Sequence, residues 1–431
     1  MNVLNLATLK DGRKAIIIRT SDRITFKQCR RKWAWSSHLK GNYGSTSLAG
    51  PLWFGSGVHY GLEDYHGYNY FGSAADAFRA YCIATSKQYQ RDLPPDAQEL
   101  FKLGTALLDY YCNVWLAHPG RPLNPTFYYP DADTGESRPQ VEVNFEIQVP
   151  LESCPRLAAL AEAQGADCVL YRGTIDRMGE DRDGNLWVYE YKTAKRAEHM
   201  HYETDPQVTV YQWAAQHIYG RPIAGVVYLQ LVKNEPKVPT PLSTGKISTA
   251  SNLVTSAPLY RRGLELMYGS ASNAPEPNQK FLTDLQLKEN ENKDRFIIRE
   301  YITRNETQLH MESQKILLEL EDMLNPDLAL YPNPTRECSR MCGFLSPCVA
   351  FDAGADWEGM IGARFGQRDS DPDTFWRRRL PSVEKMKALR GTKLIPDLEE
   401  MQLRLQDMSE ADRDSIVRGE QEVEFTMMET Y

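Results

Sequence analysis

The sequence predicts an α/β fold, in which a strand-forming core lies between helical additions. From Val141 onward the apolar residues change from helical spacing to the alternation that is typical of strands. An Asp183-Gly184 dipeptide then separates two strand-like segments, as in a β-hairpin. A helix with clear start and stop residues follows, and another apolar strand comes after it. This order of elements indicates an α/β core.

The segment before the core is predicted to be mainly helical. Residues 20–40 have the pattern of a helix, and residues 55–115 have that of two or three helices interrupted at Pro94-Pro95. A loop rich in Pro and Asp is expected at 118–139.

Four strands and one helix are expected within the core. The strands are 141–147, 169–178, 186–192 and 224–232. The helix begins after Asp205, whose side chain suits an N-cap. Pro206 suits its first turn, and Gly220 suits its end.

The chain becomes less regular beyond the core. Residues 234–258 are rich in Pro, Ser and Thr and are expected to form an exposed loop. A strand is expected at 295–302 and a helix at 306–324. Residues 353–431 are polar, and we expect a peripheral helix or partial disorder there.

Composition and charge exclude several classes of protein. The 431 residues contain no run of about 18 apolar residues that would span a bilayer. The N-terminus lacks an apolar leader segment, so we expect a cytoplasmic protein without a membrane partner. The net charge is −8, yet residues 1–40 carry +8, so only one end is expected to contact phosphate. No G-x-x-x-x-G-K-[ST] motif is present, which excludes a built-in helicase motor.

Two carboxylates and a lysine are expected to converge on one patch of the sheet. Glu190 and Lys192 are two residues apart on a strand and face one side, and the hairpin brings Asp176 close to them. Carboxylates suit Mg²⁺ or Mn²⁺, and a lysine can orient a metal-bound water or stabilise charge on a phosphoryl group. Such a set hydrolyses phosphodiesters. A surface hairpin with an ordinary Glu–Lys pair is the competing interpretation.

Residues on both sides of this hairpin complete a set of four motifs. In chain order they are G-x-x-x-H at 55–59, G-x-x-D at 173–176, E-x-K at 190–192 and Q-x-x-x-Y at 207–211. This set resembles the RecB-type branch of the PD-(D/E)XK nuclease superfamily, over roughly residues 20–350. The resemblance implies a restriction-endonuclease-like core, with a mixed central sheet flanked by helices and helical elaborations at both ends.

The resemblance also implies roles for individual residues. The ligands of one or two Mg²⁺ or Mn²⁺ ions would be His59, Asp176 and Glu190. The catalytic set would be Asp176, Glu190, Lys192, Gln207 and Tyr211. In this family the lysine serves catalysis, whereas the glutamine and tyrosine belong to a helix that supports the site and the DNA.

Four cysteines form a second candidate site. Cys338, Cys342 and Cys348 lie within eleven residues, and Cys29 lies near the other end of the chain. Four thiolates can hold either zinc or an iron–sulfur cluster. One early and three late cysteines resemble the iron–sulfur nucleases, including the AddB nuclease domain and the CRISPR-associated RecB-like exonucleases. The resemblance implies a structural 4Fe-4S cluster that joins the two ends of the nuclease region, with zinc as the alternative occupant.

A basic run with interleaved tryptophans follows the early cysteine. Residues 30–32 with Trp33 and Trp35 suit a path for single-stranded nucleic acid, with cations on phosphates and rings under bases. The same pattern is typical of a helix whose tryptophans are core and whose basic face is solvated. The sequence leaves both interpretations open.

The activity implied by the resemblance is that of a metal-dependent DNA exonuclease, which would act on ends or single strands in recombination, repair or replication. Relatives form rings or complexes, so a homo-oligomer and a helicase or replication or recombination protein are candidate partners. The alternative is a non-catalytic DNA-end-binding or scaffold protein that retains the fold and an iron–sulfur cluster. Five regions are expected along the chain. They are a helical region with Cys29 and His59 at 1–135, a nuclease core at 136–235, an insertion loop with helices at 236–335, a cysteine motif at 336–352 and a polar tail at 353–431.

Overall fold

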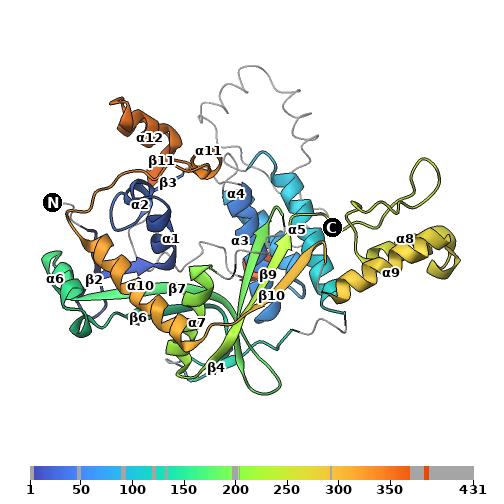
Figure 1. Cartoon of the computed structure of the whole chain (residues 1–431), viewed down its shortest axis with the longest axis horizontal. Coiled ribbons are helices and arrows are strands. Elements are labelled where there is room, and N and C mark those ends of the chain that lie inside the picture. The colour runs from blue at the N-terminus through green and yellow to red at the C-terminus, as the bar shows by residue number, and fades with distance from the viewer. Residues whose placement is uncertain are drawn as a thin grey trace.

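A mixed sheet lies at the centre of the protein in this computed structural model (Figure 1). The structure describes residues 4–45, 50–88, 94–118, 123–131, 134–196, 202, 204–291, 294–368 and 383–387. The strands of the sheet are β1 (Ala7–Thr8), β2 (Lys14–Arg19), β6 (Val141–Gln148), β7 (Cys168–Glu180), β8 (Leu186–Ala194), β9 (Ile223–Val232) and β10 (Ile297–Ile302). Their order is β1-β2-β7-β8-β9-β10, and β6 also pairs with β7. The α/β core with a mixed sheet is therefore as predicted.

The long strand β7 has three neighbours. β6 pairs with its residues 170–177, β2 with 168–172 and β8 with 177–180. Because the pairing of β6 overlaps both of the others, β2 and β8 must share the opposite edge of β7. Residues 173–176 on that edge therefore face the fork between β2 and β8. Asp176 lies in this fork.

The strands expected from alternation are confirmed as β6, β7, β8 and β9, and the later strand is confirmed as β10. β2 was not predicted. Its residues 15–18 are all buried, which gives a continuous apolar run without alternation. A helix between β6 and β7 was also not expected; it is α6 (Pro155–Ala163).

Helices cover both faces of the sheet (Figure 1). One face packs on α6, α7 (Pro206–Tyr219) and α10 (Glu306–Leu324), and the other on α3 (Gly50–His66), α4 (Ala74–Gln88) and α5 (Ala97–Tyr110), which continues as a π-helical turn at Tyr111–Trp115. Alternate residues of β8 enter the two cores: Val188 packs with the first group, whereas Tyr189 and Tyr191 pack with the second. The helices predicted at 55–115 and 306–324 are confirmed.

The termini of α7 are formed as the sequence predicts. The Asp205 side chain accepts a hydrogen bond from the backbone N–H of Gln207 at 2.8 Å, and Pro206 occupies the first turn. Gly220 ends the helix with φ +61°, a left-handed conformation that favours glycine.

The predicted helix at 20–40 is instead two helices, α1 (Thr20–Gln28) and α2 (Arg30–Ser36). Cys29 is extended between them, with φ −163°, and its sulfur accepts a hydrogen bond from the backbone N–H of Lys32. The cysteine therefore caps α2 and does not continue α1.

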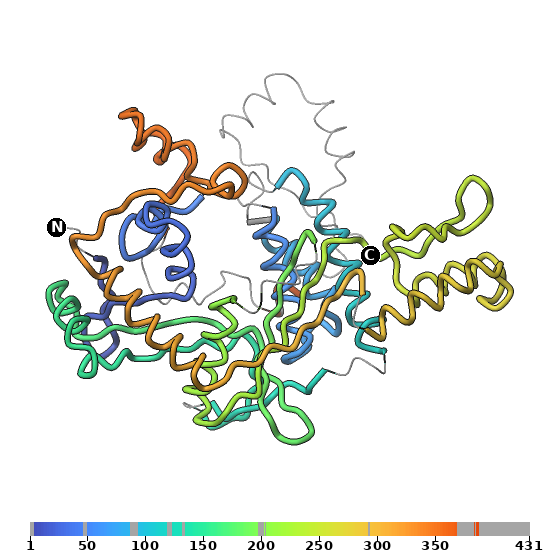
Figure 2. Tube along the Cα trace, in the orientation of Figure 1, coloured from blue at the N-terminus to red at the C-terminus, as the bar shows by residue number. Residues whose placement is uncertain are grey.

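A late segment of the chain lies beside these early helices (Figure 2). The late elements are α11 (Glu337–Met341), α12 (Leu345–Asp352), α13 (Trp357–Arg364) and β11 (Phe365–Gln367). β11 pairs antiparallel with β3 (Tyr43–Ser45), and the Asn333 side chain donates a hydrogen bond to the carbonyl of Gln28 at 3.0 Å.

The remaining elements lie outside the central sheet. They are β4 (Tyr128–Pro130), β5 (Ser137–Pro139), a short 3-10 turn at Leu151–Ser153, α8 (Ala257–Tyr268), another at Ala271–Asn273, α9 (Glu276–Asn290) and α14 (Val383–Lys387). The expected loop at 234–258 is free of helix and strand up to α8. Most of the predicted tail, 353–431, lies outside the described residues. None of the described helices is long and apolar enough to cross a membrane.

Candidate metal centre at the fork of the sheet

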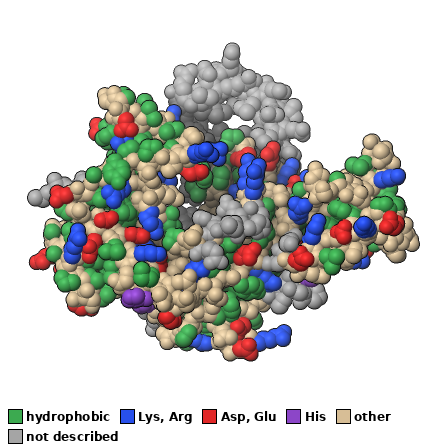
Figure 3. All heavy atoms as spheres, viewed as in Figure 1, with side chains coloured by type: hydrophobic (Ala, Val, Ile, Leu, Met, Phe, Trp, Pro, Cys, Tyr) green, Lys and Arg blue, Asp and Glu red, His purple; other side chains and the backbone are tan. Residues whose placement is uncertain are grey.

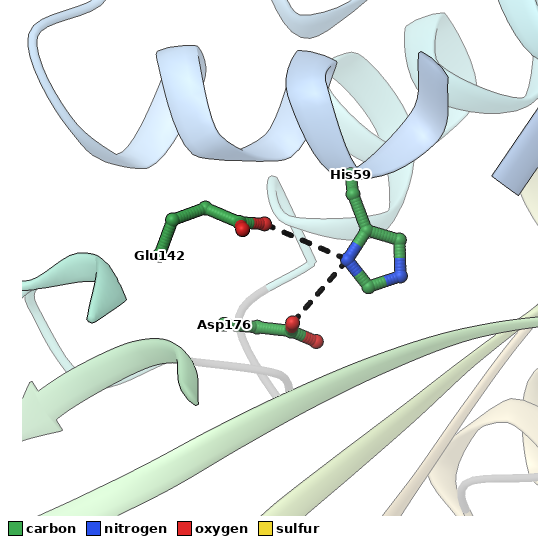
Figure 4. Close-up of side chains that lie close together, drawn as sticks. All are labelled: His59, Glu142 and Asp176. Carbon is green, nitrogen blue, oxygen red and sulfur yellow. Dashed lines mark ion pairs between the residues drawn. The ribbon is translucent and has the colours of Figure 1, made fainter. Parts of the chain in front are cut away.

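Three ionisable side chains from three elements meet at the fork beside β7 (Figure 4). The Nδ1 atom of His59, on α3, lies 3.3 Å from Oδ1 of Asp176 and 3.7 Å from Oε1 of Glu142. One ligand atom from each residue lies within 4.8 Å of the others, and all three residues are partly buried. This group matches the donor set of a hard divalent cation, two carboxylates and an imidazole.

Glu142 is a member of this group that sequence reasoning missed. It stands on β6, where Val141 lies opposite Arg177 and Val143 lies opposite Ile175. Glu142 therefore lies opposite Asp176 of β7. Its φ of +46° is in the left-handed region, which costs a non-glycine residue about 1–3 kcal/mol. The only signal in the sequence was an acidic residue at the start of a predicted strand, without a marker for the partner strand.

Asp176 is held by the backbone of the neighbouring strand. The β7–β8 ladder ends at Arg177 and Tyr189, and beyond it the backbone N–H of Tyr191 donates a hydrogen bond to Oδ2 of Asp176 at 2.7 Å. The carboxylate thus satisfies an amide where the two strands separate. One of its oxygens is fixed by the fold, and the other faces His59.

Glu190 and Lys192 lie next to this group on β8. Their side chains form an ion pair, and the charges of both act on Asp176. Glu190 is only 1% exposed. Its Oε2 atom is buried and accepts no hydrogen bond from the described part of the chain. The expected convergence of Asp176, Glu190 and Lys192 is therefore present, although Glu190 is not within the compact group around His59.

The charges of the site are strongly coupled. Burial alone would lower the pKa of His59, but Asp176 and Glu142 raise it to about 10. Burial and the charge of Asp176 raise the pKa of Glu190 to about 8, against the effect of Lys192. Burial opposes ionisation of Asp176, yet His59 and Lys192 lower its pKa. Burial and at least one neighbouring charge thus act in opposite directions on each of these groups.

The residues fit a divalent cation on this evidence. A buried carboxylate oxygen without a hydrogen-bond donor, on Glu190, stands beside a second carboxylate, on Asp176. A bound cation would satisfy that oxygen and would favour the charged form of both carboxylates.

Gln207 and Tyr211 lie together on α7, as their spacing predicts. The Gln207 side-chain amide donates a hydrogen bond to the Tyr211 hydroxyl at 2.8 Å. Burial and the charges of Glu190 and Asp176 raise the pKa of Tyr211 well above its usual value. The pair therefore borders the carboxylates, and its hydroxyl stays protonated.

The structure brings the cysteine-bearing segments together without closing the thiols around one ion. Cys348 accepts a hydrogen bond from Arg31, and burial and the nearby thiols of Cys338 and Cys29 raise the pKa of Cys342. Of the cysteine sulfurs, all of which are described, no three lie within 4.8 Å of one another. The arrangement differs from four thiolates at 2.3 Å from one zinc ion.

The tryptophans that follow Cys29 are core residues. Trp33 is fully buried and packs edge-on against Phe26 at 5.2 Å, and Trp35 stacks on Trp357 at 5.6 Å. Their burial excludes them as a stacking surface for bases and favours the interpretation of a packed helix. Figure 3 shows Lys and Arg side chains interspersed with acidic ones on the displayed face, without one continuous basic band.

The family of the chain follows from a match to a known sequence family. A family model described as the PD-(D/E)XK nuclease superfamily matches residues 21–349. A search of curated proteins finds no significant match. The matched segment spans most of the chain and includes the carboxylate site as well as all four cysteines considered above. This chain therefore belongs to the PD-(D/E)XK nuclease superfamily.

Proposed function

We propose that this protein is a metal-dependent DNA exonuclease of the RecB-like type, which hydrolyses phosphodiester bonds at the fork beside β7. The observation that carries the proposal is the convergence of His59, Glu142 and Asp176 next to the Glu190–Lys192 pair. Two or three carboxylates in one site suit a cation that binds phosphate oxygens and water. An ordinary surface hairpin would not bury a glutamate beside an aspartate.

The acidic residues and His59 would hold Mg²⁺ or Mn²⁺. His59, Glu142 and Asp176 supply the compact donor set, and Glu190 supplies its buried oxygen from the other side of the fork. When bound, the cation would lower the pKa of a water and stabilise the charge that develops on the phosphorus. The superfamily membership supports this use of the site.

Lys192 would position the attacking water and stabilise the developing negative charge. Burial lowers the pKa of Lys192, but the charges of Glu190 and Asp176 raise it by more than burial lowers it. The ammonium group therefore stays charged. It is paired with Glu190 and is 36% exposed, which leaves it accessible to a substrate phosphate. Gln207 and Tyr211 would hold this corner of the site from α7.

The four cysteines would hold a 4Fe-4S cluster with a structural role, with zinc as the alternative. Cys29 would be linked to Cys338, Cys342 and Cys348, and the contacts between α2 and the late helices already bring these segments together. A group larger than one ion suits sulfurs that do not meet within 4.8 Å. Acting on DNA ends in repair, recombination or replication, with a helicase or a second copy as partner, completes the proposal.

The proposal is tested by digestion of end-labelled single- and double-stranded DNA with Mn²⁺ or Mg²⁺. We expect cleavage by the unaltered protein, and none with a chelator or after Asp176→Asn. Asp183→Asn is the matched control, because this aspartate is exposed in the β7–β8 turn. It should cleave like the unaltered protein.

Two results would overturn the proposal. Cleavage that survives Asp176→Asn would place the chemistry elsewhere. Binding of DNA without cleavage under any metal condition would favour the alternative of a scaffold that retains the fold.

A further inference from the structure

A row of polar side chains leads away from the candidate metal centre along β7. Arg172, Thr174 and Asp176 alternate with core residues and so share one face of the strand. The Thr174 hydroxyl donates a hydrogen bond to Oδ1 of Asn144, on β6, at 2.9 Å. Asn144 is exposed and Thr174 is half-buried, whereas Arg172 is buried, so the row is open to solvent beside Asn144.

Three arginines gather at the far end of the row. Arg19 lies opposite Arg172 in the β2–β7 register. Arg368 follows β11, and its positive charge and that of Arg172 both act on Arg19, whose pKa burial and these charges lower. Arg19, Arg172 and Arg368 are called the arginine cluster below.

Two carboxylates act on the arginine cluster. Arg172 pairs with Glu146 at 2.5 Å, and Asp22 is the carboxylate that acts on both Arg19 and Arg368. Asp22 also accepts hydrogen bonds, one from the Ser37 hydroxyl at 2.8 Å and one from the backbone N–H of Arg19 at 3.1 Å, so its charge is divided further.

Two hydrogen bonds with Asn42 fix the position of the Arg368 backbone beside the cluster. Its backbone N–H donates to the carbonyl of Asn42 at 3.0 Å, and the Asn42 amide donates to the carbonyl of Arg368 at 2.9 Å. The side chain lies over Gly44, where a Cβ atom would stand 2.2 Å from its Nε. Glycine therefore lets the guanidinium cross β3 toward the cluster.

A cavity of about 890 Å³ opens beside the cluster. Basic and amide side chains that line it include Lys14, Lys40, Arg368, Asn42 and Gln164. Ile17, on the same face of β2 as Arg19, is also part of the lining. The cavity thus continues the polar face beyond the arginines, and it has the size of a site for a small ligand.

We propose that the arginine cluster is a second phosphate-binding subsite for the nucleic-acid strand whose scissile phosphate lies at the metal centre. Arg172 precedes Asp176 by four positions on β7, a distance of about 13 Å along the strand. Guanidinium groups bind phosphate through paired hydrogen bonds. Residues 1–40, which include Arg19, carry a charge of +8 in an otherwise acidic protein and so attract a polyanion. The nucleic-acid strand runs from the fork past Thr174 and Asn144 to the arginine cluster. The cavity receives the nucleotides that follow the phosphate bound by this cluster.

This inference rests on the proposed function for the direction of the strand, but its test does not need cleavage. Binding of a fluorescent single-stranded oligodeoxynucleotide is measured in a chelator over a series of salt concentrations. We expect Arg368→Gln to weaken binding about tenfold, as for a lost hydrogen bond to a charged group. The slope of log affinity against log salt should fall by about 0.7, which corresponds to one phosphate contact on a single strand.

Two further variants separate loss of a contact from loss of folding. Glu146→Gln removes a carboxylate that neutralises the cluster, so we expect binding about threefold tighter, the effect of one exposed charge. Arg262→Gln is the matched control, because this exposed arginine lies on α8 and pairs with Glu265 on the same helix. It should change neither the affinity nor the slope.

Replacing single phosphates by neutral methylphosphonates then locates the contact. The unaltered protein should lose affinity at one position, and Arg368→Gln should be insensitive at that same position. Equal slopes for Arg368→Gln and Arg262→Gln, or weaker binding after Glu146→Gln, would overturn the subsite. A changed slope without any cleavage would retain the subsite and reject the nuclease proposal, whereas cleavage with an unchanged slope would do the reverse.

Discussion

The carboxylate site draws its acidic side chains from neighbouring strands of one packed sheet, whereas the cysteine region joins an early and a late segment of the chain. Asp176 and Glu190 stand on adjacent strands, and the fold fixes both before any cation binds. The cysteine segments are joined by a small apolar cluster around Trp35 and Phe344 and by the ion pair of Arg31 with Asp352 at 2.7 Å. Their sulfurs do not converge within 4.8 Å.

The two regions therefore depend on their bound groups in different ways. A site built into a buried sheet is organised by folding, so altering its ligands should change chemistry and leave stability nearly intact. A site that links residues 309 positions apart in the chain restricts the unfolded state, so losing its bound group should reduce stability.

The largest expected effect is on the rate of cleavage after Lys192→Ala. Removing a charge that stabilises a transition state costs about 10²–10³ in kcat. We expect such a loss in single-turnover DNA cleavage, with metal binding and the melting temperature nearly unchanged. Lys195→Ala, just beyond the end of β8, is the control. A fall in melting temperature as large as that of a cysteine variant would remove the contrast between the regions.

The next effect concerns Glu142, the residue that the sequence motifs do not include. If it is a ligand, Glu142→Gln should weaken Mn²⁺ binding at least about tenfold, comparable to or greater than the loss of a supporting residue around a metal. Calorimetric titration with Mn²⁺ measures this. Glu152→Gln, in the 3-10 turn after β6, should bind as the unaltered protein does. Unchanged affinity for Glu142→Gln would exclude Glu142 from the metal site.

In the cysteine region we expect Cys342→Ser to affect stability. The melting temperature should fall by about 5–10 °C, because a link between distant segments contributes a few kcal/mol. Iron content should fall in parallel, while the folded fraction still cleaves DNA. Cys154→Ser is the control, since this partly buried thiol does not belong to the set of Cys29, Cys338, Cys342 and Cys348. Loss of cleavage without loss of stability would make the cysteine region part of the active site.

The smallest expected effect is a pH dependence in the turn of the β7–β8 hairpin. Hydrogen bonds from Trp187 and Asn185 lower the pKa of Asp181 to about 2. Because the folded pKa is lowered from 3.8, this carboxylate stabilises the hairpin above about pH 4, and the contribution disappears as the pH falls through about 2. Asp181→Asn should therefore melt slightly lower than the unaltered protein at pH 7, and the two should agree near pH 2. A difference that persists near pH 2 would assign the effect to packing.

The sequence predicts those parts of the fold that have local signals. Alternation identifies β6 and β8, and capping residues place both ends of α7. β2 is missed because a strand buried on both faces lacks alternation. The break at Cys29 is missed because it depends on the cysteine capping α2, a contact that spacing does not specify.

The same reasoning explains the outcome at the site. Asp176, Glu190 and Lys192 are connected by a short hairpin, whose turn is readable from Asp183-Gly184. Glu142 reaches the site only through the pairing of β6 with β7, across an unexpected helix. The arginine cluster depends on a parallel strand and on the late β11, both of which are long-range pairings without local markers.

The central claim is that the fork beside β7 is a divalent-metal centre, and Mn²⁺ binding followed by electron paramagnetic resonance tests it most directly. Free Mn²⁺ is titrated against the metal-free protein and against Asp176→Asn, which needs no knowledge of the substrate. We expect one or two Mn²⁺ ions to bind the unaltered protein, and this binding to be lost in the variant. Equal binding by both proteins, or no binding by either, would contradict the account.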